Sequence, residues 1–234
     1  MKHIVVIPTY NEAENIENLI SELFYMYPSI SILIVDDSSP DGTAEIVKKL
    51  KSKYDNLHLL LQDKKSGLAK AYINGFKYAI EKGFDVFTSM DADFSHNPKY
   101  LKDAVRIIED GYDLACGSRY INNACTDEKN LFKNIISIGG NIYINLVLGK
   151  QLKDWTGGFN TYTKKALELI DINSIDVKGY IFQAQMKYRA LKRKCRIKEF
   201  PIIFETRIKG KSKMSISIVL EAFFSVLKIK FGEQ

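Results

Sequence analysis

The stretch VFTSMDADFSHNP, residues 86–98, ends an apolar run with two aspartates that are one residue apart. An ordinary strand ends in a turn of Gly, Asn or Pro, and a single aspartate is enough to begin such a turn. If the strand continues through them, Asp91 and Asp93 point to the same face, because strand side chains alternate. Two neighbouring carboxylates repel unless a cation neutralises both. The stretch therefore predicts a strand that presents two carboxylates to a positively charged group.

The same succession of apolar run and polar cluster occurs twice more upstream, after Pro8 and after Val35. Short apolar runs alternate with segments of helical spacing along the first half of the chain, which predicts an α/β fold with a mostly parallel sheet flanked by helices. The predicted strands are residues 3–8, 30–35, 57–62, 84–90 and 112–119. Ligands of such sheets bind beyond the carboxyl ends of the strands. We expect the polar clusters after Pro8, Val35 and Met90 to form one site at that edge.

The pattern is looser after Arg119. Helices are predicted at residues 131–149, 179–194 and 215–230, and a strand within 195–207. Residues 153–170 read as a loop or short strand that leads into a helix. The chain shows no repeat, low-complexity tract or linker, so residues 1–234 are predicted to form a single domain, with 214–234 a C-terminal amphipathic helix.

Charge is distributed unevenly. The net charge is +6, yet residues 187–213 alone hold eleven Lys or Arg against two acids. A local basic excess indicates an anionic partner near the C-terminal third. Nucleic acid, a phosphorylated substrate and an acidic membrane surface are all compatible with it.

Cysteine usage and the N-terminus bear on location. The three cysteines, Cys116, Cys125 and Cys195, are odd in number and lack metal-ligand spacing, which fits a reducing cytosolic compartment. Met1 leads into HIVVIPTYNE, which lacks the apolar segment of a signal peptide. No window reaches the roughly 18 apolar residues of a membrane-spanning helix. We expect a cytoplasmic protein.

The chemistry of the paired aspartates suggests a metal. Mg²⁺ and Mn²⁺ prefer oxygen ligands and often share one or two carboxylates with substrate phosphates. The alternative for Asp91 and Asp93 is a solvated loop in which Asp93 caps the helix after Pro98. Both interpretations fit this short motif taken alone.

The two upstream clusters suggest a nucleotide. Asp36 and Asp37 follow an apolar run, and a carboxylate there can accept hydrogen bonds from a base or ribose; the alternative is that one or both only cap the turn. Tyr10 could cover a base. Glu12 lies near a helix start, where stabilisation of the helix dipole alone would favour an acid.

Six motifs in this order carry a family resemblance: VVIPTYNEAENI, VDDSSPDGT, MDADFSHNP, GSRY, TGGF and KSKMS. The chain resembles glycosyltransferase family 2 and, within it, the catalytic subunit or domain of dolichol-phosphate (polyprenyl-phosphate) mannosyltransferases. The resemblance extends from about Ile4 to about Ser215. VDDSSPDGT and SKMS are more specific to this branch than PTYNE. The resemblance implies the GT-A nucleotide-diphospho-sugar transferase fold in a single domain.

The resemblance also implies the site residues. The nucleotide-sugar site would comprise Pro8, Tyr10, Glu12, Val35, Asp37, Asp91, Ala92, Asp93, Arg119, Gln183, Arg207 and Lys213. The metal, Mg²⁺ or Mn²⁺, would be held by Asp91, Asp93 and Ser95, the last standing where some members have Gln. The acceptor phosphate would contact Arg119, Lys133 and Arg207. The catalytic residues would be Asp93, Arg119, Arg207 and Lys213.

The implied reaction is transfer of mannose from GDP-mannose to a dolichyl or polyprenyl monophosphate, with inversion to a β-linked product. The acceptor phosphate is already an anionic nucleophile, so it needs positioning more than a general base. One alternative is a family 2 transferase that uses a UDP-sugar (glucose or GlcNAc) with a polyprenyl-phosphate or glycan acceptor. A nucleic-acid-binding module is disfavoured, because aspartates at three strand ends would repel phosphate without a metal. A catalytically silent partner subunit is disfavoured by the intact Asp91, Asp93 and Arg119.

The last predicted helix bears on membrane attachment. Ser217, Glu221, Ser225 and Lys228 form a polar stripe, and the rest of the helix is mostly apolar. With the lysines just upstream, it could lie in a membrane interface, or it could pack on the protein's own core. We expect a peripheral protein on the cytosolic face of a membrane, or one partnered by a small membrane-anchoring subunit.

Overall fold

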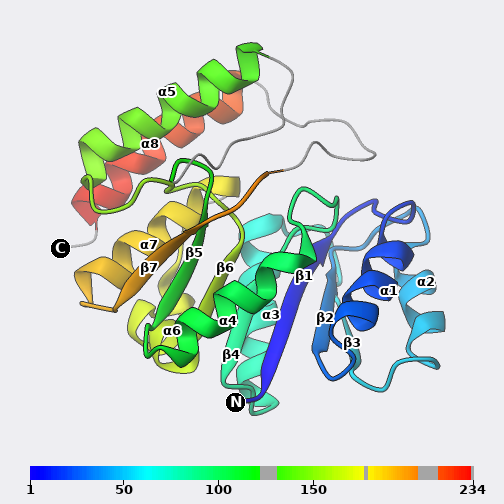
Figure 1. Ribbon diagram of the computed structural model, residues 1–234. Coiled ribbons are helices and arrows are strands. Elements are labelled where there is room, and N and C mark those ends of the chain that lie inside the picture. The colour runs from blue at the N-terminus through cyan, green and yellow to red at the C-terminus, as the bar shows by residue number, and fades with distance from the viewer. Residues whose placement is uncertain (122–130, 177–178, 205–215, 233–234) are drawn as a thin grey trace.

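A mixed sheet forms the centre of the molecule, as the computed structural model shows for residues 1–121, 131–176, 179–204 and 216–232 (Figure 1). Its seven strands in the described residues are ordered β3-β2-β1-β4-β6-β5-β7. They are β1 (His3–Thr9), β2 (Ser31–Asp36), β3 (Leu57–Leu61), β4 (Val86–Ser89), β5 (Leu114–Ser118), β6 (Asn160–Thr163) and β7 (Ile197–Pro201). Only β6 runs antiparallel to its neighbours, β4 and β5. The predicted mostly parallel α/β sheet is confirmed.

Helices cover both faces of the sheet, and each face has its own hydrophobic cluster. One cluster includes buried residues of α3, α5, α6, α7 and α8, and the other those of α1, α2 and α4. The helices are α1 (Ile16–Met26), α2 (Thr43–Leu50), α3 (Leu68–Glu81), α4 (Leu101–Glu109), α5 (Leu131–Leu148), α6 (Lys164–Ile170), α7 (Phe182–Lys192) and α8 (Ile216–Gly232). Because both faces are covered, central strands such as β1 are apolar on both sides, which is why HIVVIP does not alternate.

Helix α3 lies unusually close to the sheet. At Gly75 an added Cβ would lie 2.5 Å from Cγ1 of Val6 on β1 and 2.9 Å from Cγ2 of Val35 on β2. Only glycine permits this approach, because a methyl group at such distances would overlap those side chains. The close packing brings Tyr72, one turn earlier on α3, against the end of the sheet where the polar clusters lie.

Several predicted boundaries differ from the structure. The helix predicted after Pro98 begins as one turn of 3-10 helix, Pro98–Tyr100, capped by Asn97, whose Oδ1 accepts from the Lys99 amide. The strand predicted within 195–207 is shorter, as β7, and the predicted helix 214–234 corresponds to α8. The segment interpreted as a loop or short strand supplies β6, which inserts between β4 and β5.

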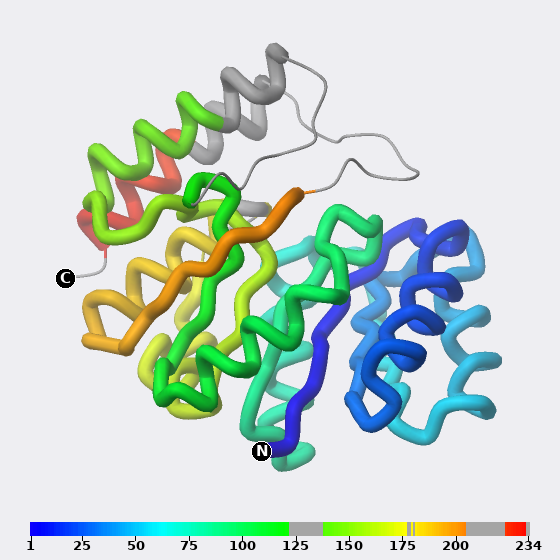
Figure 2. Tube along the Cα trace, in the orientation of Figure 1, coloured from blue at the N-terminus to red at the C-terminus, as the bar shows by residue number. Residues whose placement is uncertain are grey.

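Helices α5 and α8 lie side by side at the end of the molecule where the parallel strands finish, as the trace in Figure 2 also shows. The ring of Tyr143 on α5 stacks on Phe223 of α8 at 4.3 Å. Val226 and Ile229 of α8 are buried, whereas Phe224 is exposed. The last helix therefore packs on the protein's own core and also presents aromatic surface outward. Packing on the core and contact with a membrane interface, the two alternatives that the sequence left open, are thus compatible.

Candidate active site

A pocket opens at the edge of the sheet where β1, β2 and β4 end. It is lined by Pro8, Thr9, Tyr10, Glu12, Asp37, Lys65, Gly67, Leu68, Ala71, Asp91, Ala92 and Asp93. The structure thus brings together the three loops that the sequence predicted to converge. It adds a fourth segment that the sequence analysis did not single out, the loop before α3 with Lys65 and Gly67.

The two aspartates of the central motif lie in a turn, not in a strand. β4 ends at Ser89, one residue before the predicted end at Met90, and Phe94 has a positive φ of 64°, so the strand does not continue through Asp91 and Asp93. Side chains replace the sheet partners: Nδ1 of His96 accepts from the amide of Asp91, and Oδ1 of Asp93 accepts from the Ser95 amide at 3.1 Å. Local side-chain bonds of this kind compete with strand pairing. Both carboxylates nevertheless reach the same pocket.

Fixed hydrogen bonds orient both carboxylates. Tyr72 donates its hydroxyl hydrogen to Asp91, and the Ser95 hydroxyl donates to Oδ1 of Asp93 at 2.5 Å. Ser95, predicted as a third metal ligand, is fully buried and acts in this structure on the orientation of Asp93. Because Nδ1 of His96 accepts a hydrogen bond, it carries no proton, and its 3.9 Å separation from Oδ2 of Asp91 is not an ion pair.

The donor set fits a hard divalent ion that is shared with a substrate. Two oriented carboxylates in one pocket are the protein's usual contribution to a Mg²⁺ site in which phosphates and water complete the coordination. Within the described residues, no group of three or more His, Cys, Asp or Glu could hold a metal by protein ligands alone. Asp91 and Asp93 therefore suit an ion that arrives with a diphosphate.

The second pair of aspartates divides its roles. Asp36 accepts from the hydroxyls of Thr9 and Ser39 and from the Ser39 amide, so it closes the turn after β2. Asp37 lines the pocket and binds the loop before α3. The alternative that one of the two only caps the turn is therefore correct for Asp36. Val35, predicted as a nucleotide contact, is fully buried in the hydrophobic cluster of α3 and does not line the pocket.

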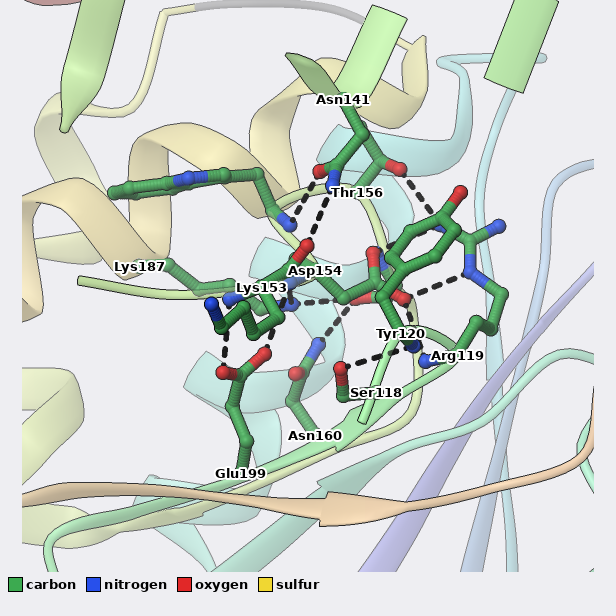
Figure 3. A network of polar contacts seen from close by, with 12 residues as sticks. Ser118, Arg119, Tyr120, Asn141, Lys153, Asp154, Thr156, Asn160, Lys187 and Glu199 are labelled. Carbon is green, nitrogen blue, oxygen red and sulfur yellow. Dashed lines mark hydrogen bonds and ion pairs between the residues drawn. The ribbon is translucent and has the colours of Figure 1, made fainter. Parts of the chain in front are cut away.

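Arg119, predicted to contact phosphates, is held by a buried acid that the sequence analysis did not identify (Figure 3). Its Nε lies 2.7 Å from Oδ2 of Asp154, its Nη2 lies 2.8 Å from Oδ1, and the same Nη2 donates to Thr156. Burial alone would raise the pKa of Asp154, but the charge of Arg119 and its hydrogen bonds lower that pKa to about 2. The pair is therefore ionised at neutral pH, and Arg119 is not among the residues that line the pocket.

The loop that carries Asp154 is fixed from two further sides. Lys187 of α7 donates from Nζ to the carbonyl oxygens of Asp154 at 2.8 Å and Gly157 at 3.1 Å. Glu199 of β7 accepts from the amides of Lys153 and Asp154, as Figure 3 shows. Lys187 is fully buried, so the first lysine of the basic segment 187–213 belongs to this network and not to a basic surface.

The remaining predicted residues lie away from the pocket or outside the description. Gln183, at the start of α7, is buried, and its Oε1 accepts from Nδ2 of Asn160 at 3.0 Å and from the hydroxyl of Tyr162. Arg207 and Lys213 lie outside the described residues. Lys133 lies in the first turn of α5, where side chains are not described.

Comparison with known proteins identifies the architecture around this pocket. The family model described as "Glycosyl transferase family 2" matches residues 4–170, which includes the pocket and the Arg119–Asp154 pair. The chain belongs to glycosyltransferase family 2. The resemblance deduced from the six motifs is confirmed.

Two relatives within the family cover nearly the whole chain. Polyprenol monophosphomannose synthase from Mycolicibacterium smegmatis is 38% identical over 95% of this chain and 84% of its own length. Undecaprenyl-phosphate mannosyltransferase from Micrococcus luteus is 37% identical over 97% of this chain and 93% of its own. Among solved structures, a mannosyltransferase from Pyrobaculum calidifontis in complex with GDP-Man and Mn²⁺ matches with a TM-score of 0.67 and 16% identity, over 97% of this chain and 64% of that one. This last likeness supports the GT-A fold.

Proposed function

We propose that the protein transfers mannose from GDP-mannose to a polyprenyl or dolichyl monophosphate, with inversion, to give a β-linked polyprenyl-phosphate mannose. The observation that carries the proposal is the single pocket in which Tyr10, Asp37, Asp91 and Asp93 come together at the carboxyl edge of the sheet. The ring of Tyr10 and the carboxylate of Asp37 suit a nucleoside. The paired carboxylates of Asp91 and Asp93 suit a metal-bound diphosphate. The names of the two relatives support mannose as the sugar and a polyprenyl phosphate as the acceptor.

Asp91 and Asp93 would hold Mg²⁺ or Mn²⁺, as the Mn²⁺ complex of the Pyrobaculum calidifontis mannosyltransferase supports. When bound, the ion neutralises the negative charge that develops on the departing nucleoside diphosphate. The chain's own residues contribute by orienting the two carboxylates. Tyr72 and Ser95 fix the two carboxylates before the donor arrives, so little reorganisation is needed at the moment of transfer.

Arg119 would position the acceptor phosphate. Asp154 and Thr156 use its Nε and Nη2, and no partner of its Nη1 lies among the described residues. A guanidinium held rigidly from one side loses little entropy when its other side binds phosphate oxygens. Lys133, Arg207 and Lys213 stay as predicted contacts of the donor and acceptor phosphates.

The acceptor's lipid chain implies a membrane contact, and α5 offers a surface for it. Ile138, Ile142 and Leu146 follow one another at four-residue spacing and are 48%, 55% and 70% exposed. Phe224 and Phe231 of the adjacent α8 are exposed as well. Such a surface suits peripheral binding at the cytosolic face of a bilayer. In the described part of the chain no helix has the length and apolarity needed to span a membrane. A small membrane-anchoring subunit remains a prediction.

The direct test is incorporation of label from radiolabelled GDP-mannose into an organic-extractable product. The protein is incubated with Mn²⁺ or Mg²⁺ and a short polyprenyl phosphate, and parallel reactions contain labelled UDP-glucose or UDP-GlcNAc. Extractable, metal-dependent label from GDP-mannose alone supports the proposal. Label from a UDP-sugar alone would show that the donor is a UDP-sugar and not GDP-mannose. An absence of transfer to any lipid phosphate would contradict the proposed acceptor.

A further inference from the structure

Residues 202–204, which follow β7, lie between two parts of the proposed active site, the turn with the paired aspartates and the end of β5 that leads to the buried arginine. On one side, the amide of Ile202 donates to the carbonyl oxygen of Ser118, the last residue of β5. On the other side, the amide of Ile203 donates to the hydroxyl of Tyr100 at 2.9 Å. Tyr100 ends the short 3-10 helix that follows the turn. The segment therefore joins the two parts through its backbone.

The close approach of this segment to β5 depends on a glycine. A Cβ added to Gly117 would lie 2.9 Å from Cδ1 of Ile202 and 3.0 Å from the carbonyl oxygen of Phe159. A larger residue would overlap both atoms, and the backbone oxygen could not move aside without disturbing the sheet. The place of residues 202–204 against the end of β5 is therefore fixed by packing as well as by hydrogen bonds.

The ring of Phe204 contacts both parts of the site. Its centroid lies 5.6 Å from that of His96, edge to face at 76°, and Cζ of Arg119 also lies 5.6 Å from the Phe204 centroid. Both separations are within the range of favourable aromatic and cation–π contacts. His96 is buried, and its Nδ1 accepts from the amide of Asp91. One ring therefore contacts the arginine directly and the turn with the paired carboxylates through a single histidine.

A second ring contacts Arg119 from another element. Cζ of Arg119 lies 5.3 Å from the centroid of Tyr120, whose ring lies beside the arginine in Figure 3. In the described part of the chain, the rings that His96 contacts are those of Phe159 and Phe204. Tyr120 and Phe204 thus make the same kind of contact with the guanidinium, and of these two only Phe204 also contacts the histidine.

Direct transfer requires a fixed relation between the two parts of the site. The attacking oxygen has to lie about 3–3.5 Å from the anomeric carbon and in line with the departing group. Asp91 and Asp93 would hold the donor diphosphate through the metal, and Arg119 would hold the acceptor phosphate. Tyr72 orients a carboxylate within the first part, and Asp154 orients the arginine within the second. A contact between the parts is what sets the distance from one to the other.

We propose that Phe204 is a positioning residue, which sets the place of Arg119 relative to the turn of Asp91 and Asp93 and so aligns the acceptor phosphate with the donor. The inference rests on the proposed function and adds the residue that keeps its two substrates in register. Loss of the ring leaves both substrates bound but lowers the rate at which the bound pair reacts, because alignment is lost and affinity largely is not.

The test compares Phe204→Leu with Tyr120→Leu, since each variant removes one ring from Arg119. Both are expected to raise the KM of the acceptor about threefold, the effect of losing one cation–π contact. Only Phe204→Leu is expected to lower kcat, about tenfold, and Phe204→Tyr, which keeps the ring, should retain most of it. Calorimetry should give the wild-type dissociation constant for GDP with Mn²⁺ in all three variants, because Tyr72 and Ser95 still orient the carboxylates.

Three results would overturn the inference. They are an unchanged kcat in Phe204→Leu, an equal loss of kcat in Tyr120→Leu, and a Phe204→Tyr variant as slow as Phe204→Leu. Weaker binding of GDP with Mn²⁺ in Phe204→Leu would also overturn it, because the ring would then act on the metal site itself.

Failure of the proposed function gives a different result. If the donor is a UDP-sugar or the acceptor another phosphate, the proposed function changes and the same variants are compared with those substrates. If no transfer occurs at all, the proposed function fails and the inference is judged by unfolding free energies. Phe204→Leu should then be non-additive both with His96→Asn, which keeps an acceptor for the Asp91 amide, and with Arg119→Gln. Additivity with either variant would overturn the inference.

Discussion

The hydroxyl oxygen of Tyr72 lies 3.0 Å from Oδ1 of Asp91, and the tyrosine is fully buried on α3. Burial and the charge of Asp91 raise the pKa of Tyr72 well above its ordinary value, so the phenol stays protonated and donates. Helix α3 therefore sets the direction of the first of the two carboxylates that we propose to bind the metal. The close approach of α3 at Gly75 makes that contact possible.

Replacing Tyr72 by Phe removes this hydrogen bond and leaves the ring packing with Phe182 in place. We expect affinity for Mn²⁺ in the presence of GDP to fall about tenfold, as is typical when a partner of a metal ligand is lost. Electron paramagnetic resonance of free Mn²⁺ measures it. Tyr78→Phe, on the same helix and away from the pocket, is the control. Equal Mn²⁺ affinity in the two variants would contradict an orienting role.

Asp93→Ala is expected to abolish both Mn²⁺-dependent GDP binding and label transfer while the protein stays folded. The turn loses one carboxylate, but the sheet and helices do not depend on it. Circular dichroism checks the fold, and Asp103→Ala, an exposed acid on α4, controls for the loss of one negative charge. Full transfer activity in Asp93→Ala would contradict the metal site.

Asp154→Asn removes the negative half of the buried pair and leaves the charge of Arg119 uncompensated. The free energy of unfolding is expected to fall by about 3 kcal/mol, the usual cost of breaking such a pair. Chemical denaturation measures it. The double variant Asp154→Asn, Arg119→Gln should lose less than the sum of the two single variants, because the pair is removed together. Strict additivity would show that the two side chains do not stabilise each other.

Protonation of His3 should make stability depend on pH. Burial lowers its pKa from 6.5 to about 4, so the unfolded chain binds the proton more readily. The contribution of neutral His3 to the stability of the folded protein is complete above the pKa of the unfolded state. It is lost as the pH falls through the pKa of the folded state. Between pH 7.5 and pH 5 the wild type should lose about 2 kcal/mol from this residue. His3→Gln should show a correspondingly smaller loss in denaturation curves, and an identical pH profile would contradict the assignment.

The exposed apolar stripe of α5 should mediate membrane binding. A double change of Ile142→Glu and Leu146→Glu is expected to reduce flotation with anionic lipid vesicles by most of its amplitude, because two charges would enter the apolar layer. GDP binding should be unchanged, since neither residue lines the pocket. Tyr25→Glu on α1, which also introduces a glutamate, at an 87% exposed position on the opposite face of the sheet, is the control. Undiminished flotation of the double variant would show that the membrane contact does not lie on α5.

Much of the fold and part of the site follow from the sequence because they depend on short-range patterns. Apolar runs such as residues 3–8 and 30–35 are long enough to specify buried parallel strands, and polar clusters after parallel strands must meet at one edge. Tyr10, Asp91 and Asp93 were identified in this way, whereas Asp37 was distinguished from Asp36 only by the family resemblance, and the structure brings all four into one pocket.

Other features depend on contacts between distant segments, which no local pattern encodes. β6 lies antiparallel between β4 and β5, so its place depends on pairing with two strands that are distant in the sequence. Arg119 finds Asp154 35 residues away, and Lys187 is buried because carbonyl groups of that same loop receive its ammonium. The sequence thus determined which residues reach the edge of the sheet. The tertiary structure decided which charges are paired, buried or left facing the pocket, because a charge is stable away from water only where folding supplies it with partners.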